Sequence, residues 1–313
     1  MTRALTFPGQ GSQSVGMGKD LAEVFAAARE VFEEVDEALK SGLSKLMFEG
    51  PIETLTLTEN AQPALMATSL AVVRVLEREA GFDIARHASF VAGHSLGEYS
   101  ALAVAGALGL SDAARLLRHR GQAMQRAVPV GRGAMAALIG VELEAARAIA
   151  DDAARGQVCA AANDNGGGQV VISGDKDAVE RAMALALERG AKRALPLPVS
   201  APFHSPLMAP AAREMEDALA TVTISPPRIP VIANVTAQPV SDPDTIRRLL
   251  VEQVTGLVRW RETVESFKAR GVTQAVELGA GKVLSGLAKR IDRDLETASV
   301  GTPADIESFS KSL

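Results

Sequence analysis

Three features that would each indicate a particular class of protein are scarce or missing in this sequence. Cys159 is the only cysteine among 313 residues, which excludes an intrachain disulfide and a zinc site built on several cysteines. The longest apolar stretch, around residues 101–110, is about half of the ~20 residues that a membrane-spanning helix needs. Residues 1–7 lack the basic and apolar regions of a secretory signal. We therefore expect a cytoplasmic protein without a membrane partner.

The charge and composition indicate a globular protein that does not bind nucleic acid. Lys and Arg number 33 against 38 Asp and Glu, for a net charge of -5, and no block of basic residues occurs. Nucleic-acid binding depends on a basic surface, so we expect no nucleic-acid partner. With 47% hydrophobic residues, the chain is long enough for one large domain with an insertion or for two domains.

The two ends of the chain read as an α/β unit. A short strand over residues 3–7 breaks into a loop over 7–13, and helices are predicted over 20–40 and 62–80. A strand over 89–92 follows, and another helix begins just after Gly97. After residue 202 the pattern resumes, with helices at 206–220 and after Asp244 and Arg261, and strands at 231–234 and 275–278. This alternation predicts a parallel sheet covered by helices.

The middle of the chain has an order of its own. Strands are predicted over 134–139, 158–162, 169–173 and 192–199, with helices over 142–155 and 176–189, which is the βαββαβ pattern of a ferredoxin-like unit. The segment 163–168, Asn-Asp-Asn-Gly-Gly-Gly, is typical of a tight hairpin turn. We expect an inserted subdomain over 129–198 within a large catalytic subdomain formed by 1–128 and 199–313.

The segment Gly93-His94-Ser95-Leu96-Gly97 fits the G-x-S-x-G nucleophile elbow. An apolar strand precedes it and a helix follows it, which is the context the motif requires. A sharp strand-to-helix turn exposes the Ser95 hydroxyl, and the backbone N–H of Leu96 can stabilise an oxyanion. The alternative is an ordinary strand–helix turn that happens to contain a serine.

A serine hydroxyl needs a base within hydrogen-bonding reach, and four histidines compete for that role. His87 and His119 fall in segments that look exposed, and His94 is adjacent to Ser95, where neighbouring side chains diverge. His204 lies in a loop far downstream, in the Ser-then-His order of α/β-hydrolases. We predict His204 as the base, the alternative being a core or capping histidine.

Arg120 is predicted to be buried, because it lies on the apolar face of the helix over 111–127. The residues three, four and seven positions away are all apolar: Ala113, Leu116, Leu117, Ala123 and Met124. A buried guanidinium needs an anionic partner, which can be a substrate carboxylate bound by two hydrogen bonds. The alternatives are a side chain that reaches out to solvent or a structural pair with Asp or Glu.

The glycine loop around Gln10 can offer a second backbone N–H to an oxyanion. It is not a dinucleotide-binding loop, since Ser14 occupies the third glycine position, and it lacks the Gly-Lys-Ser/Thr ending of a P-loop. A nucleotide site is therefore disfavoured. Cys159 falls within an apolar strand, where packing is expected rather than nucleophilic chemistry.

Five segments taken together resemble the malonyl-CoA:acyl-carrier-protein transacylase family, over residues 7 to about 291. They are Phe7-Pro8-Gly9-Gln10-Gly11-Ser12-Gln13, Gly93-His94-Ser95-Leu96-Gly97-Glu98-Tyr99, Arg120-Gly121, Pro202-Phe203-His204 and Glu277-Leu278-Gly279-Ala280-Gly281-Lys282-Val283-Leu284. Ala280 departs from the family, which usually has proline there, while Phe203 is similar to malonyl-selective members. The resemblance implies a hydrolase-like large subdomain with a ferredoxin-like insert.

The resemblance also implies an activity and roles for individual residues. Ser95 would be the nucleophile and His204 its base, with Arg120 holding the malonyl carboxylate. The N–H groups of Gln10 and Leu96 would form the oxyanion hole, and the backbone carbonyl of Gln253 would orient the histidine. The implied reaction is a ping-pong transfer of malonyl from malonyl-CoA to acyl carrier protein in fatty acid biosynthesis. No bound cofactor or metal and a monomer are expected.

Two other functions fit parts of the same pattern. A serine hydrolase, either a thioesterase or an esterase, would share the elbow and the base, and it would differ by admitting water. A scaffold protein that docks carrier protein without chemistry would keep the fold and form no acyl-serine. A buried Arg120 favours a carboxylated acyl group over a plain lipid.

Overall fold

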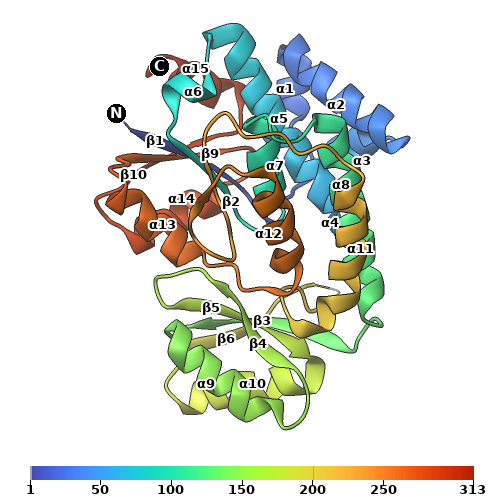
Figure 1. Cartoon of the computed structure of the whole chain (residues 1–313), viewed down its shortest axis with the longest axis vertical. Coiled ribbons are helices and arrows are strands. Elements are labelled where there is room, and N and C mark those ends of the chain that lie inside the picture. Colours follow the sequence, from blue (N-terminus) through green and yellow to red (C-terminus); the bar gives the residue numbers. More distant parts are fainter. Residues whose placement is uncertain (1, 200) are drawn as a thin grey trace.

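The computed structural model describes residues 2–199 and 201–313, and it contains two sheets (Figure 1). Met1 and Ser200, both in the segments predicted for the large subdomain, lie outside the described residues. The large sheet has helices on both faces, and the smaller sheet with its two helices lies beneath it in the view of Figure 1. The predicted fold class, α/β with a ferredoxin-like second unit, is confirmed.

The large sheet has the strand order β10-β9-β1-β2-β7-β8. Its strands are β1 (Arg3–Phe7), β2 (Phe90–Gly93), β7 (Val231–Ile232), β8 (Pro239–Val240), β9 (Gln274–Leu278) and β10 (Glu296–Val300). All neighbouring pairs are parallel except β7 and β8, which pair antiparallel at one edge. The predicted parallel sheet is therefore present, with one antiparallel edge strand.

The two faces of the large sheet pack against different helices. Leu5 and Phe7 of β1 point into the main core, whereas Ala4 points into a second cluster on the opposite face. All five residues of β1 are buried, as expected for a parallel strand covered on both faces. The helices of the large unit are α1 (Lys19–Val24), α2 (Ala26–Leu39), α3 (Leu43–Glu49), α4 (Ile52–Thr56), α5 (Thr58–Ala80), α6 (Ile84–His87), α7 (Gly97–Val104), α8 (Leu110–Ala127), the short 3-10 helix η1 (Pro206–Met208), α11 (Ala209–Ala220), α12 (Pro243–Thr255), α13 (Trp260–Ala269), α14 (Val283–Ile291) and α15 (Pro303–Ser310).

The small sheet is antiparallel, with the order β4-β5-β3-β6. It contains β3 (Gly133–Ile139), β4 (Cys159–Asp164), β5 (Gln169–Asp175) and β6 (Arg193–Pro196), with α9 (Leu143–Ala154) and α10 (Lys176–Glu188) packed on one face. These elements lie within the predicted insert. Its boundaries, 129 and 198, we keep as a proposal.

The small unit is joined to the large one by backbone hydrogen bonds and by an ion pair. The N–H of Asp164 donates to the carbonyl of Val258 at 2.9 Å, and the N–H of Val258 donates to Ala162 at 2.9 Å. Arg261 of α13 donates from Nε to the buried Asp164 carboxylate at 2.9 Å. The end of β4 is therefore fixed against the large unit beside the segment that follows α12.

Several predicted elements have different bounds in the structure. The helix predicted over 20–40 is two helices, because Phe25 adopts an extended conformation and packs its ring against the core. Helix α5 begins four residues earlier than predicted, at Thr58. Strand β6 ends at Pro196 rather than at the predicted residue 199. Pro198 has no backbone N–H to donate to the neighbouring strand, so the pairing does not continue through it.

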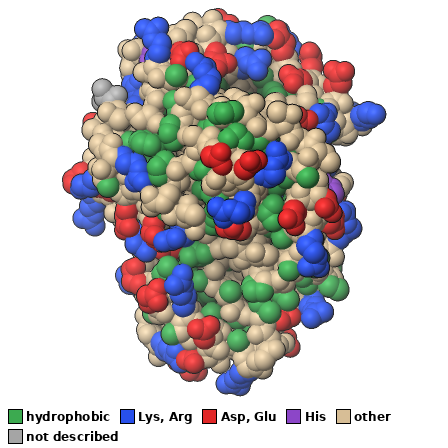
Figure 2. Space-filling model, in the orientation of Figure 1, with side chains coloured by type: hydrophobic (Ala, Val, Ile, Leu, Met, Phe, Trp, Pro, Cys, Tyr) green, Lys and Arg blue, Asp and Glu red, His purple; other side chains and the backbone are tan. Residues whose placement is uncertain are grey.

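The surface carries both signs of charge. Figure 2 shows acidic and basic side chains interspersed over the visible face. In the described part of the chain, no helix is both long and apolar enough to cross a membrane.

Candidate active site

Ser95 lies at a strained turn between β2 and α7. Its φ of 53° is in the left-handed region, which a residue with a side chain rarely adopts. A Cβ added to Gly93 would lie 1.8 Å from the Gly97 carbonyl oxygen, and one added to Gly97 would lie 2.2 Å from the Phe7 carbonyl oxygen. Only glycine fits on either side of the serine, which explains the spacing of the motif.

The Ser95 hydroxyl lies against His204, as the sequence predicted. Ser95 Oγ and His204 Nε2 are 2.7 Å apart, and His204 Nδ1 is 2.9 Å from the backbone carbonyl of Gln253. Because a carbonyl oxygen only accepts, Nδ1 carries the proton and Nε2 is free to accept the serine proton. The imidazole is thereby held in the tautomer that a base requires.

His204 is buried, with 3% of its surface exposed. Burial lowers the pKa of His204 to about 3, and the nearby Arg120 charge acts in the same direction. The side chain is therefore neutral at ordinary pH. A neutral imidazole with a free Nε2 is the form that can take a proton.

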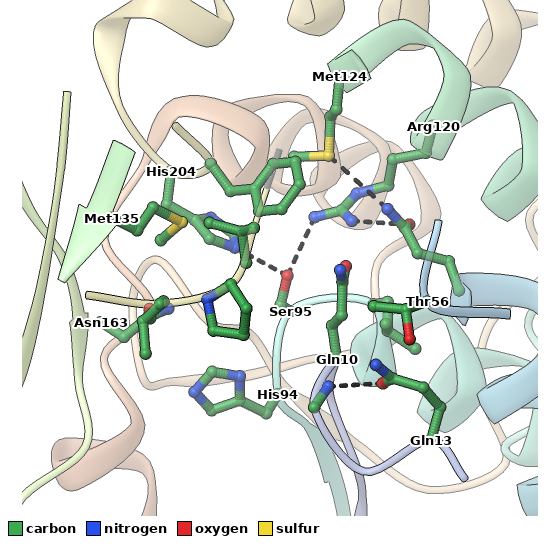
Figure 3. Close-up of a pocket in the computed structure, with 17 residues that line it drawn as sticks. Gln10, Gln13, Thr56, His94, Ser95, Arg120, Met124, Met135, Asn163 and His204 are labelled. Carbon is green, nitrogen blue, oxygen red and sulfur yellow. Dashed lines mark hydrogen bonds between the residues drawn. The ribbon is translucent and has the colours of Figure 1, made fainter. Parts of the chain in front are cut away.

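Arg120 of α8 is buried, with 1% of its surface exposed, and its guanidinium points at the serine (Figure 3). Its Nη1 donates to Gln62 Oε1 at 2.8 Å, and its Nη2 donates to Gln253 Oε1 at 2.9 Å and to Ser95 Oγ at 3.2 Å. Both amide partners are neutral. Among the described residues no carboxylate forms an ion pair with Arg120, and its Nε has no hydrogen-bond partner.

The predicted oxyanion donors border the same cavity. Gln10 follows β1 and Leu96 precedes α7, and both line the cavity together with Ser95. Within the described residues, the backbone N–H groups of Gln10 and Leu96 donate to no other group. Both donors are therefore available to a bound oxygen.

The cavity is formed where the two units meet. The large unit contributes the residues already described, and the small unit contributes Met135 and Asn163, which Figure 3 shows beside His204 and below it. Leu197 and Phe203 add apolar surface. The site is thus lined by apolar side chains around a few polar groups, as small-molecule sites usually are.

The other candidates take no part in the hydrogen bonds that join Ser95, His204 and Arg120, although His94 lines the cavity. His94 Nε2 bonds to Asn165 Oδ1 at 2.9 Å in the predicted hairpin turn, while His119 faces Glu214 at 3.8 Å and His87 bonds within its own helix turn. Burial raises the pKa of Cys159 to about 11, so its thiol is a poor nucleophile. The described residues contain no cluster of His, Cys, Asp and Glu able to hold a metal ion.

Four buried polar residues in or behind the cavity were not singled out for their side chains by sequence reasoning. They are Gln62, Glu98, Asn234 and the amide of Gln253, each at most 2% exposed. Asn234 Oδ1 accepts the Ser95 N–H at 2.8 Å, and Glu98 accepts from Gln253 Nε2 at 2.7 Å. Glu98 was within reach of the sequence, since it follows the elbow directly on an apolar helix.

The arrangement suits acyl transfer through a serine ester. It combines a hydroxyl, a neutral base, two free backbone donors and a buried cation that lacks an anionic partner. A buried cation of this kind can bind a carboxylate. Because the residues that line the site come from segments far apart in the sequence, the site exists only in the folded chain.

Comparison with known proteins gives the same assignment. The model of the acyl transferase domain family matches residues 5–300. The malonyl CoA-acyl carrier protein transacylase of Bacillus subtilis (strain 168) is 49% identical over 305 residues, covering 97% of this chain and 95% of the relative. The crystal structure of the acyl-carrier-protein-S-malonyltransferase from Bartonella henselae has a TM-score of 0.98 at 58% identity, covering 100% and 99% of the two chains.

A third similar protein is a malonyl-transacylase solved in complex with the acyl-carrier protein of a type II PKS. It has a TM-score of 0.96 at 43% identity, covering 100% of both chains. The matches extend over nearly the whole chain and include both sheets. The chain therefore belongs to the acyl transferase domain family, in the group of the malonyl CoA-acyl carrier protein transacylases.

Proposed function

We propose that this protein is an [acyl-carrier-protein] S-malonyltransferase, which moves a malonyl group from coenzyme A to the phosphopantetheine thiol of acyl carrier protein. The observation that carries the proposal is the buried Arg120 charge, 3.2 Å from Ser95 Oγ and bonded otherwise to neutral amides. A malonyl group has a carboxylate two carbons from its thioester carbonyl. Such a group can meet the guanidinium while its carbonyl carbon meets the serine.

In the first half of the reaction, the thioester is exchanged for an ester. His204 Nε2 takes the hydroxyl proton as Ser95 Oγ attacks the thioester carbon, and the N–H groups of Gln10 and Leu96 bind the oxyanion. The C–S bond then breaks, and the departing thiolate takes the proton back from His204. The products are free coenzyme A and a malonyl-Ser95 ester.

In the second half the same groups act in reverse. The phosphopantetheine thiol gives its proton to His204 and its sulfur attacks the ester carbon. The C–O bond breaks, and Ser95 Oγ recovers the proton. The carrier as acceptor is supported by the similar transacylase solved with its acyl-carrier protein. Malonyl-CoA as the donor, the absence of a cofactor, the cytoplasm and the monomer remain predictions.

The fixed tautomer of His204 supports its role in both halves. Gln253 O accepts from Nδ1 in the position that an aspartate occupies in a triad, so a Ser-His pair suffices here. Occupation of the Arg120 site by a carboxylate would also offset the positive charge that disfavours a protonated His204. The substrate would thereby make the base stronger when it is needed.

The test is intact-protein mass spectrometry after brief mixing with malonyl-CoA, with peptide mapping of the adduct. We expect a malonyl adduct on Ser95, and none on the Ser95→Ala variant. Acetyl-CoA serves as the matched donor without a carboxylate and should label Ser95 far more slowly. Addition of holo acyl carrier protein should then discharge the adduct onto the carrier thiol.

The same experiment separates the alternatives. Free malonate without transfer to the carrier would indicate a hydrolase. No adduct and no malonate would contradict any acyl chemistry and would favour a scaffold.

A further inference from the structure

The carboxyl group of Glu98 is buried beside the reacting atoms, yet neither step of the proposed transfer uses it. It lies in the first turn of α7 and is 2% exposed. In the described part of the chain, no Lys, Arg or His lies within ion-pair distance of it; burial raises the pKa of Glu98 to about 7, while its hydrogen bonds and the Arg120 charge act in the opposite direction. Burying a carboxylate without a cation in direct contact is costly in free energy. A carboxyl group kept at this position therefore has a role that its hydrogen bonds should reveal.

One oxygen of Glu98 holds two other segments of the chain. Glu98 Oε2 accepts from the side-chain Nε2 of Gln253 at 2.7 Å and from the backbone N–H of Asn234 at 3.1 Å. Gln253 belongs to α12, and Asn234 follows β7. A single carboxylate oxygen therefore ties the elbow helix to both segments.

Gln253 in turn hydrogen-bonds to three of the residues that the proposed reaction uses: Ser95, Arg120 and His204. Its Nε2 donates to the carbonyl of Ser95 at 3.0 Å, its Oε1 accepts from Arg120 at 2.9 Å, and its backbone oxygen accepts from His204 at 2.9 Å. Because Glu98 accepts from Nε2, the amide is turned so that its oxygen faces the guanidinium. The reverse orientation would place two donors against each other.

Asn234 forms two hydrogen bonds with the backbone of the elbow. Its Oδ1 accepts the N–H of Ser95 at 2.8 Å, and its Nδ2 donates to the carbonyl of Gly93 at 2.7 Å. These bonds hold a backbone whose φ at Ser95 is 53°. The strained turn is thus supported by a residue that Glu98 itself anchors.

We propose that Glu98 is a positioning residue for acyl transfer, which fixes the catalytic groups relative to one another through Gln253 and Asn234. The assignment rests on the proposed function, since it is defined by the same acylation of the serine. Misplacement of reacting groups by about 1 Å can cost about 100-fold in rate. Loss of these hydrogen bonds should therefore slow acylation and weaken the choice of a carboxylated donor.

Two substitutions separate hydrogen bonding from charge. Glu98→Met keeps the length of the side chain and removes both acceptor interactions. Glu98→Gln removes the charge but leaves an amide oxygen able to accept from both partners, since both bonds end on one oxygen. The measurement is the single-turnover rate of Ser95 acylation with malonyl-CoA, and its ratio to the rate with acetyl-CoA.

We expect Glu98→Met to lower the malonyl rate about 10- to 100-fold and to lower the malonyl-to-acetyl ratio. Glu98→Gln should restore both to values close to those of the unchanged protein. The matched control is Glu277→Gln, which alters another fully buried carboxylate, one that accepts from the backbone of α14 at Ser285. That control can lose stability but should keep the ratio.

Each outcome decides the assignment. A folded Glu98→Met variant with unchanged rate and ratio would overturn it, and so would a Glu98→Gln variant as impaired as Glu98→Met. If Glu98→Met does not fold, Glu98→Ala, which leaves space for water, carries the same expectation. An unchanged protein that forms no malonyl adduct would overturn the proposed function and this assignment together, whereas a normal adduct isolates a failure of the assignment alone.

Discussion

At the scale of the residue, the central feature is a buried charge whose hydrogen-bond partners are neutral. Arg120 donates to two amide oxygens and a hydroxyl, none of which is ionised. Burial lowers the pKa of Arg120, but a guanidinium starts so high that it stays charged. A guanidinium held in this way binds an incoming carboxylate with little rearrangement, because its N–H groups are already oriented.

Arg120→Ala should therefore change which donor is used. We expect kcat/KM for malonyl-CoA to fall about 100-fold or more, equivalent to about 3 kcal/mol, because a buried carboxylate loses its partner. The rate with acetyl-CoA should hold or rise, since acetyl has no carboxylate to bind. Steady-state kinetics with both donors measure this.

The control for Arg120→Ala is Arg115→Ala, on the same helix but exposed and paired with Asp112. It should leave both rates unchanged. An equal loss of malonyl and acetyl transfer in Arg120→Ala would contradict the assignment of the carboxylate site.

At the scale of the element, the elbow shows how a strand and a helix create a reactive position. The chain turns from β2 into α7 within three residues, and the glycines on either side contact backbone atoms directly.

Several other elements gave no clear signal in the sequence. The short helices α3, α4 and α15 and strand β10 were not predicted, because their short runs carry little periodicity and depend on packing. Helix α14 was not predicted either, although its buried residues Leu284, Leu287 and Ala288 have helical spacing.

Gly93→Ala should disrupt the elbow. The added methyl would lie 1.8 Å from the Gly97 carbonyl oxygen and 2.4 Å from the Glu98 nitrogen, and these backbone atoms cannot move aside as a flexible side chain can. We expect a loss of about 3 kcal/mol in the free energy of unfolding and an acylation rate lower by about 100-fold. Denaturant unfolding and mass spectrometry measure the two effects.

Gly286→Ala is the matched control, since Gly286 lies within α14 and an added Cβ would meet no atom within 4 Å. It should stabilise the protein by about 0.5–1 kcal/mol and leave acylation unchanged. If Gly93→Ala retains full activity and stability, the steric explanation of the motif is wrong.

At the scale of the whole molecule, the site depends on how the two units are fixed together. The end of β4 forms backbone hydrogen bonds with Val258 of the large unit. The ion pair between Arg261 and Asp164 adds a second link between the two units. Asp164 is 2% exposed, so its carboxylate has almost no water to replace a lost cation. Because Asn163 and Met135 of the small unit line the cavity, movement of this unit would alter the cavity.

Arg261→Ala should lower the free energy of unfolding by about 2 kcal/mol, less than for a fully buried pair because Arg261 is itself partly exposed. We also expect a higher KM for the donor. Lys311→Ala, which removes an exposed pair with Glu307, should cost less than about 1 kcal/mol and leave KM unchanged. Equal effects of the two substitutions would show that the interface pair has no special weight.

Patterns that are local in the chain could be predicted from the sequence. The elbow around Ser95 follows from a strand, two glycines and a helix in succession, and the burial of Arg120 follows from helical periodicity. The βαββαβ order of the small unit follows from alternating periodicities. The pairing of Ser95 with His204 needed elimination among four histidines together with the family resemblance, and the structure brings the two within 2.7 Å.

Only the tertiary structure decided which polar side chains support these groups. Glu98 lies three residues from Ser95, yet its partners Asn234 and Gln253 are 136 and 155 residues away in sequence. Gln62 meets Arg120 across 58 residues. No periodicity encodes such contacts, because they arise when helices and loops pack on a sheet whose strand order is not the order of the chain. The sequence by itself was enough to propose the reacting groups, because their motifs are local, whereas packing decided which side chains hold them in place.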